Sequence, residues 1–296
     1  MHASAFYPLF RPRLCVIMKT ETIRKEVASV LRAKNACLRL AAGEMDYIRF
    51  GSGGKPLLML PGVGDGLKTV RGMALPFALL YRELAKDFTV YVFSRRRDLP
   101  PHFTTREMAE DLNEAMAALG LKNAAVVGVS QGGMIAQWLA IDHPERVGKL
   151  VLTVTLCRPN DTARAVIARW TEMAERGDYR GIMLDTAERS YSETRLKQVR
   201  REYQVLGSLG KPKSFARFLT QAESCVTHDA YAQLGRIACP TLVIGGTEDR
   251  IVTGEASEEI AAQIPGAELF LYEGLSHGLY EEAPDFLARV SAFCRG

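Results

Sequence analysis

The segment Gly128–Gly132 places a serine, Ser130, between glycines two positions before it and two positions after it. An apolar run over 124–127 precedes this segment, and a helical pattern from Gly133 to Asp142 follows it. Such a sharp strand-to-helix turn forces its central residue into a strained conformation, and larger flanking side chains would collide with the neighbouring helix or strand. The serine hydroxyl then stands clear of the backbone at the positive end of the helix dipole. The sequence therefore predicts an exposed nucleophile at Ser130.

A serine hydroxyl is a weak nucleophile at neutral pH, so Ser130 requires a base and a third group that orients the base. His277 follows a strand pattern over 268–272 and lies in a loop of small residues, where it can reach a nucleophile at the end of another strand. We therefore predict His277 as the base. The remaining histidines lie in the N-terminal tail, a proline-rich loop, a helix end and a long helical insert: His2, His102, His143 and His228.

The orienting carboxylate is expected between Ser130 and His277 in the chain and just after a strand. Asp249 follows the strand pattern over 240–246 and is the predicted acid. The adjacent Glu248, and Asp161 after an earlier strand, stay open as alternatives. A structural role is also open, in which Asp249 only caps a helix that begins near Thr253.

Strand and helix patterns alternate along the chain, which indicates a mostly parallel sheet with helices on both faces. Ligands bind such sheets at the carboxyl ends of the strands, where all three candidate residues fall. Local patterns add a helix over Ile23–Asn35, a strand hairpin that turns near Gly43, a helix over 77–86, and a helix from a capping box at Thr104 to Leu119.

Serine, aspartate and histidine in this order, each after its own strand, resemble the α/β-hydrolase superfamily from about Met45 to the C-terminus. The resemblance implies an α/β fold with a doubly wound, mostly parallel sheet and an inserted all-helical cap. It also implies that Ser130, His277 and Asp249 act as nucleophile, base and orienting acid. Four further stretches carry the likeness: 60–64, 108–112, 143–147 and 276–284.

The resemblance further implies two backbone N–H groups that stabilise a developing oxyanion, those of Gln131 and Val63. The loop Pro61–Gly66 around Val63 has three glycines, which suit a close backbone approach. Many relatives have His-Gly where this chain has Pro61–Gly62, so a hydrogen bond that orients the loop is missing or replaced. Relatives also have Asp-x-Arg-Gly-x-Gly where Ser94–Asp98 holds three arginines; we expect a solvated loop, with attraction of an anionic substrate as the alternative.

About eighty residues between the strand ending near Thr155 and the strand beginning near Thr241 show helical spacing. Helices are predicted over 163–176, 179–191, 194–206 and 214–226. We therefore divide the chain into an N-terminal tail and helix, a core in two parts, and a helical cap or lid: 1–36, 37–156 with 237–296, and 157–236. A cap of this size favours a bounded cavity for a small substrate. A few of its large apolar residues are expected to line that cavity: Trp170, Met173, Met183, Leu184, Phe215, Phe218 and Leu219.

With 296 residues and 47% apolar content, the chain can bury the core of one α/β domain with an insert. A net charge of +4 without a basic, aromatic-rich stripe makes nucleic acid an unexpected partner. No segment has membrane-spanning length, and no metal-binding spacing or cofactor motif appears. Six scattered cysteines indicate buried thiols in a reducing compartment, the cytoplasm. Met18 is a plausible alternative start.

These observations predict a carboxylesterase-like serine hydrolase without cofactor, acting on small, largely apolar esters or lactones through an acyl-enzyme. Two alternatives stay open. The same three side chains could hydrolyse a carbon–carbon bond in a diketone-type ring-fission product. The fold could also hold a small ligand without turning it over. The sequence is compatible with a monomer or a homodimer.

Overall fold

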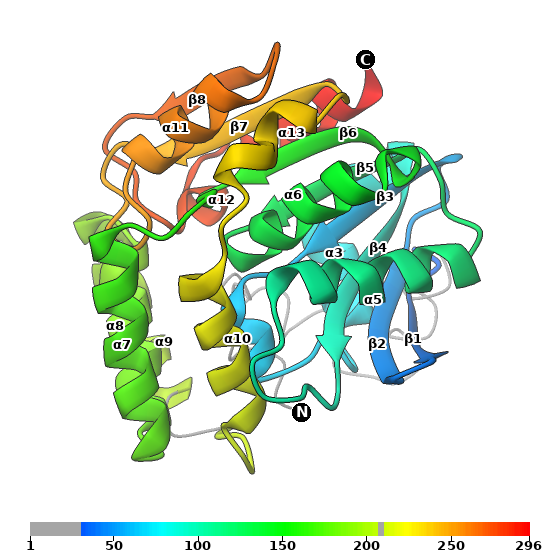
Figure 1. Cartoon of the computed structure of the whole chain (residues 1–296). Helices are drawn as coiled ribbons and strands as arrows, with labels where there is room; N and C mark the ends of the chain where they lie inside the picture. Colours follow the sequence, from blue (N-terminus) through cyan, green and yellow to red (C-terminus); the bar gives the residue numbers. More distant parts are fainter. Residues whose placement is uncertain (1–30, 207–209) are drawn as a thin grey trace.

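The computed structural model describes residues 31–206 and 210–296, which form an eight-stranded sheet flanked by helices (Figure 1). The strand order is β1-β2-β4-β3-β5-β6-β7-β8; β1 and β2 pair antiparallel with their neighbours, and β3 to β8 run parallel. This confirms the predicted fold class. The strands are β1 Lys34–Leu40, β2 Gly43–Phe50, β3 Lys55–Leu60, β4 Phe88–Arg96, β5 Ala124–Val129, β6 Val147–Thr153, β7 Thr241–Gly246 and β8 Glu268–Tyr272.

Helices cover both faces of the sheet because the parallel strands are apolar on both sides. In β4 the side chains alternate: Tyr91 and Phe93 join the apolar cluster under α5 and α6, while Val90 and Val92 join the cluster under α3 and α13. The helices outside the insert are α3 Ala74–Leu80, α4 Leu84–Asp87, α5 Thr105–Ala118, α6 Gln131–Asp142, α11 Glu255–Gln263, α12 Leu279–Glu282 and α13 Phe286–Arg295, with 3-10 turns η1 Val63–Gly66 and η2 Pro144–Arg146.

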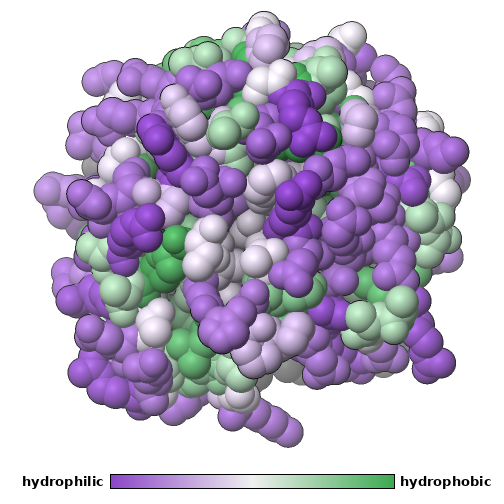
Figure 2. All heavy atoms as spheres, viewed as in Figure 1, coloured by the Kyte–Doolittle hydropathy of each residue, from purple (hydrophilic) through white to green (hydrophobic). Residues whose placement is uncertain are grey.

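The segment that connects β6 to β7 is mostly helical and lies beside the carboxyl ends of the strands (Figure 1); we call it the insert. An apolar cluster joins it to the sheet part through Leu67, Met134 and Ile251. Figure 2 shows apolar side chains between hydrophilic ones over this region. The predicted helices match the observed ones closely: α7 Asp161–Glu175, α8 Tyr179–Ser190, α9 Glu193–Leu206 and α10 Ala216–Thr227, followed by the 3-10 turn η3 Tyr231–Arg236.

Several local predictions can be compared directly with the structure. The hairpin near Gly43 and the capping box at Thr104 are both present. The single helix predicted over 77–86 is wrong in detail, because a turn separates the two short helices α3 and α4. Phe77 and Leu84 nevertheless pack into the same apolar cluster. The helix predicted over 23–35 lies mostly outside the described residues, and its last two positions belong to β1.

The expectation that the three arginines after β4 form a solvated loop is wrong. β4 extends to Arg96, and Arg95 and Arg96 are about 5% exposed or less. Each guanidinium finds acceptors in the fold: Arg95 donates to the Pro61 carbonyl, and Arg96 donates to the Ala42 carbonyl. Arg97 binds Asp46 at 2.6 Å. Burial of these cationic side chains is tolerated because carboxylates lie nearby: the charge of Arg95 lowers the pKa of Asp65, and Arg96 lies 3.3 Å from Asp111.

The cysteines are only in part the buried thiols that we predicted. Cys157, Cys225 and Cys294 are buried, whereas Cys37 is exposed on the edge strand β1 and Cys239 is intermediate. Cys15 lies outside the described residues. Across residues 31–206 and 210–296, no helix has the length and apolar character needed to cross a bilayer.

The elbow between β5 and α6 leaves no room for a side chain at Gly132. A Cβ atom there would lie 2.0 Å from the Leu60 carbonyl oxygen. We expect Gly132→Ala to lower the free energy of unfolding by about 3 kcal/mol, because the backbone of β3 or α6 must shift. Gly54→Ala is the control, since open space surrounds Gly54. Chemical denaturation measures both, and equal stabilities would contradict the close packing of the elbow.

Candidate active site

Ser130 occupies the predicted strained turn between β5 and α6. Its backbone has φ 53° and ψ −122°, a conformation that costs a non-glycine residue about 1–3 kcal/mol. Hydrogen bonds maintain it: the Ser130 amide donates to the Thr153 carbonyl, and the Ser130 carbonyl accepts from the Thr155 hydroxyl at 2.7 Å. A Cβ at Gly128 would lie 2.6 Å from the Gly132 carbonyl oxygen, which explains the flanking glycine.

His277 and Asp249 come together from the loops after β8 and β7. His277 Nδ1 lies 2.8 Å from Asp249 Oδ2, and both side chains are largely buried. The other carboxylate oxygen accepts hydrogen bonds from the amides of Ile251 and Val252 at 2.8 and 3.0 Å. These contacts orient the carboxylate, which in turn orients the imidazole ring.

Asp249 is suited to hold a protonated histidine. Burial alone would raise the pKa of Asp249, but the charge and hydrogen bond of His277 and two amide hydrogen bonds outweigh burial and lower the pKa. The helix-cap interpretation is wrong, because α11 begins after Gly254 without a side-chain cap. The two alternative candidates for the orienting acid, Glu248 and Asp161, have exposed side chains, and Asp161 lies at the start of α7.

Ser130 and His277 both line a cavity between the sheet and the insert, with about 1130 Å³ of atom-free space including its open mouth. Val63 lines it as well, beside the strained turn. Of the apolar insert residues considered above, three line the cavity: Trp170, Met183 and Phe218. Met173, Leu184, Phe215 and Leu219 pack against the apolar cluster of the insert.

The loop after β3 brings backbone donors close to Ser130. A Cβ at Gly62 would lie 3.3 Å from the Ser130 Cβ, so the backbone approaches the serine closely. Neither the Val63 amide nor the Gln131 amide donates a hydrogen bond to any residue that the structure describes. Both are therefore available to an oxygen atom placed over Ser130.

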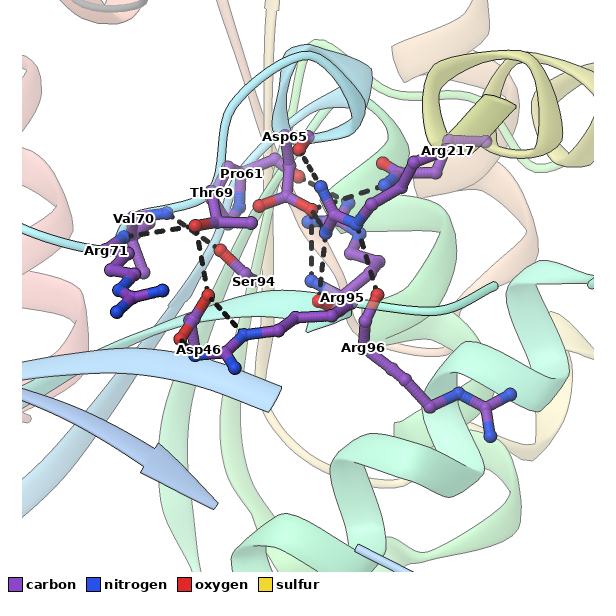
Figure 3. A network of polar contacts seen from close by, with 12 residues as sticks. Asp46, Pro61, Asp65, Thr69, Val70, Arg71, Ser94, Arg95, Arg96 and Arg217 are labelled. Carbon is purple, nitrogen blue, oxygen red and sulfur yellow. Dashed lines mark hydrogen bonds and ion pairs between the residues drawn. The ribbon is translucent and has the colours of Figure 1, made fainter. Parts of the chain in front are cut away.

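A buried polar network holds this loop, which has Pro61 where a histidine was expected from the family resemblance (Figure 3). Arg95 Nη2 donates to the Pro61 carbonyl at 2.5 Å and to Gln131 Oε1 at 2.9 Å. Gln131 Nε2 donates hydrogen bonds to the Gln221 carbonyl and the Ser224 hydroxyl in α10. One guanidinium thus binds both segments that carry the candidate oxyanion donors.

Asp65 links the same loop to the insert. Its Oδ2 atom accepts from the Arg95 amide at 3.0 Å and from Arg217, which also binds the Asp65 carbonyl (Figure 3). Burial alone would raise the pKa of Asp65, but the charges of Arg217 and Arg95 outweigh it and lower the pKa. The carboxylate is therefore ionised and joins loop, strand β4 and helix α10.

The other described histidines make separate contacts. His102 binds Glu223 on the surface, and His143 binds Glu110 at the end of α6. His228 is buried, with Nδ1 2.8 Å from the Thr105 hydroxyl, and burial lowers its pKa to about 3. None of these three is among the described residues that line the cavity.

Sequence reasoning missed the network residues Asp65, Arg95 and Arg217. The signal was present only in part: Asp65 stands between two glycines of the predicted loop, and Arg95 is the second residue after a predicted strand over 89–93. The alternative function of the arginine run, attraction of an anionic substrate, receives no support, because none of Arg95–Arg97 is among the described cavity-lining residues. Within the described residues, no cluster of metal-ligating side chains is found.

The chain is similar to known proteins. A family model described as alpha/beta hydrolase fold matches residues 55–284. The chain is 30% identical over 228 residues to the putative carbamate hydrolase RutD of Caulobacter sp. (strain K31), covering 72% of this chain and 83% of that protein. It is 29% identical over 257 residues to the 2-hydroxymuconate semialdehyde hydrolase of Pseudomonas putida, covering 85% and 90%.

A third relative is the pimeloyl-[acyl-carrier protein] methyl ester esterase of Chromobacterium violaceum. The two chains are 31% identical over 234 residues, which is 74% of this chain and 86% of the esterase. The family model spans well over half of the chain, and the eight-stranded, mostly parallel sheet with its helices fits that fold. The chain therefore belongs to the α/β-hydrolase fold family.

Proposed function

We propose that this hydrolase cleaves small, largely apolar carboxylic esters or lactones through an acyl-enzyme. Ser130 attacks the carbonyl carbon, His277 takes the hydroxyl proton and returns it to the leaving group, and Asp249 holds the His277 ring. Water then releases the acyl group by the same route. The observation that carries this proposal is the 2.8 Å contact between His277 and Asp249 beside a cavity that Ser130 also lines.

The tetrahedral intermediate would be stabilised by the backbone amides of Val63 and Gln131. Their availability, and the close approach of Gly62 to Ser130, support this assignment. Donors placed in advance at a low-dielectric site act where negative charge develops, and they need no reorganisation during the reaction. The helical insert 157–236 would serve as the lid that closes the cavity over the substrate.

The cavity lining disfavours an anionic substrate, because the carboxylates of Asp65 and Glu281 line it. Much of it is apolar, and among the described lining residues Lys68 is the single lysine or arginine. Burial lowers the pKa of Lys68, so its positive charge is held less firmly than at the surface. The similarity to a methyl ester esterase agrees with an ester substrate.

Hydrolysis of a carbon–carbon bond is the second candidate. The similarity to a 2-hydroxymuconate semialdehyde hydrolase over 85% of the chain favours it. The same serine, base and oxyanion donors would serve that reaction. A non-catalytic ligand-binding role is less well supported, because the strained backbone at Ser130 has no structural benefit in a protein that only binds.

A fluorophosphonate probe tests the mechanism directly. We expect one probe molecule to attach to each protein molecule, at Ser130 when the labelled peptide is identified by mass spectrometry. Turnover is then compared on short p-nitrophenyl esters, lactones, carbamates and vinylogous diketones, with esters or lactones expected to give the largest kcat/KM. Absence of labelling would refute the acyl-enzyme route, and a preference for diketones would select the carbon–carbon reaction.

A further inference from the structure

One part of the cavity wall is polar and has no role in the proposed chemistry. Glu281 lies in α12, four residues after His277, and lines the cavity together with Tyr191 and Tyr203 from the insert. The Tyr191 hydroxyl donates to Glu281 Oε2 at 2.6 Å, and the hydroxyls of Tyr191 and Tyr203 are 3.2 Å apart. Both tyrosines are less than 10% exposed, so this group is part of the cavity and not of the outer surface.

The direction of these hydrogen bonds follows from counting protons. A phenol has a single O–H, and that of Tyr191 is given to Glu281. In the contact between the two tyrosines, Tyr203 is therefore the donor and Tyr191 the acceptor. Both hydroxyl protons therefore point along the chain of hydrogen bonds toward the Glu281 carboxylate. This leaves the Glu281 carboxylate as an acceptor for a further hydrogen bond. A carboxylate can accept more than the one bond that Tyr191 makes.

The charge of Glu281 is only weakly compensated. Burial raises the pKa of Glu281 to about 7, although the Tyr191 hydrogen bond and the charge of Arg195 act in the opposite direction. Arg195 itself lies over the Tyr191 ring, with its guanidinium carbon 6.0 Å from the ring centroid. The adjacent negative charge of Glu282 adds to the rise. A bound cation or N–H group would therefore find a carboxylate whose negative charge it can stabilise.

We propose that Glu281, held by Tyr191 and Tyr203, is a subsite for a hydrogen-bond-donating group at the end of an otherwise apolar substrate. This rests on the proposed function, because it names the substrate class of the same cavity. The shared chemistry is an N–H or O–H donor, which an ammonium group or a hydroxyl group can supply. A hydrogen bond to a charged acceptor gives roughly 10- to 100-fold in affinity, and the ammonium group is expected to gain more than the hydroxyl.

The experiment compares p-nitrophenyl hexanoate with its omega-hydroxy and omega-amino derivatives. Wild type is expected to prefer the amino ester about 10-fold or more in kcat/KM, mainly through KM, because the interaction is present in both ground state and transition state. In Glu281→Gln this preference is expected to disappear; the readout is the ratio of kcat/KM for the amino ester to kcat/KM for the unsubstituted ester, which a general change in turnover does not alter. A preference that survives in Glu281→Gln overturns the subsite.

Glu282→Gln is the matched control, since Glu282 is the neighbouring glutamate and binds Ser192 instead of lining the cavity. It is expected to keep the wild-type preference. A second measurement separates this proposal from the proposed function and needs no variant: calorimetry of wild type with hexanamide and its omega-amino derivative. Equal affinities overturn the subsite. Tighter binding of the amino amide, together with no hydrolysis of any ester, keeps the subsite and refutes the esterase function.

Discussion

Replacing Ser130 with alanine is expected to lower kcat for short p-nitrophenyl esters by roughly 10⁶-fold, the loss found when a triad serine is removed. The alanine leaves the imidazole of His277 without a hydroxyl to activate, and no acyl-enzyme can form. Stability is expected to change little, because alanine at this position keeps the same backbone strain that serine has. The assay is initial-rate hydrolysis, with thermal unfolding to establish that the fold persists.

The control for this variant is Ser52→Ala, since Ser52 is an exposed serine in the loop before β3. It should hydrolyse the esters at the wild-type rate. Undiminished turnover in Ser130→Ala would refute the proposed mechanism. Loss of the folded state in Ser130→Ala would contradict the expectation that this variant is as stable as wild type. Ser130→Cys would then be tested, because it keeps a nucleophile at the same turn.

Exchanging Asp65 for asparagine is expected to lower the free energy of unfolding by about 3–5 kcal/mol, because it leaves the mostly buried guanidinium of Arg217 without its carboxylate. The turn η1 would lose the carboxylate contacts that link it to the Arg95 amide and to Arg217, so the Val63 amide would be held less firmly near Ser130. Loss of one oxyanion donor typically lowers kcat by roughly 10²–10³-fold. Denaturant unfolding and ester kinetics measure the two effects.

The pH dependence of this stabilisation has a definite sign. The pKa of Asp65 is below its usual value of 3.8 in the folded protein, so the unfolded chain binds the proton more readily. The stabilisation is therefore fully present above the unfolded pKa and is lost as the pH falls through the folded pKa. The stability difference between wild type and Asp65→Asn should be constant above about pH 5 and shrink below about pH 4.

Asp87→Asn provides the comparison for Asp65→Asn. Asp87 pairs with Arg295 at 3.1 Å, but both side chains are at least one third exposed. Its loss should cost less than about 1 kcal/mol, as for most surface ion pairs. A similar decrease in the free energy of unfolding in both variants would show that the buried Asp65 network stabilises the fold no more than a surface ion pair does.

The elements of the fold could be predicted because their signals are local. The capping box at Thr104 and the glycines around Ser130 fix a helix start and a turn within a few residues. The positions of His277 and Asp249 followed from topology, since the carboxyl ends of parallel strands meet at one edge of the sheet. Sequence order therefore placed both residues at this edge, but only their 2.8 Å contact distinguishes Asp249 from the alternatives Glu248 and Asp161.

The buried arginines could not be predicted in the same way. Whether Arg95 is solvated depends on acceptors that lie 34 and 36 positions away in the chain, at Pro61 and Gln131. Arg217 is more than 120 positions from the strand whose carbonyls it binds. The role of Glu281 depends likewise on Tyr191, 90 positions earlier. A local charge pattern contains no information on partners that only the completed fold brings near.

The contact between η1 and α10 determines which part of the insert can move. Gly66 touches α10 so closely that a Cβ there would lie 2.6 Å from the Phe218 Cα, and Arg217 adds its charged contacts. Helix α10 is therefore bound to the same rigid body as the serine and would travel with it. The end of α8 is held in a similar way, because a Cβ at Gly278 would lie 2.8 Å from the Ser190 carbonyl oxygen. A disulfide between α10 and η1 should therefore be harmless to turnover.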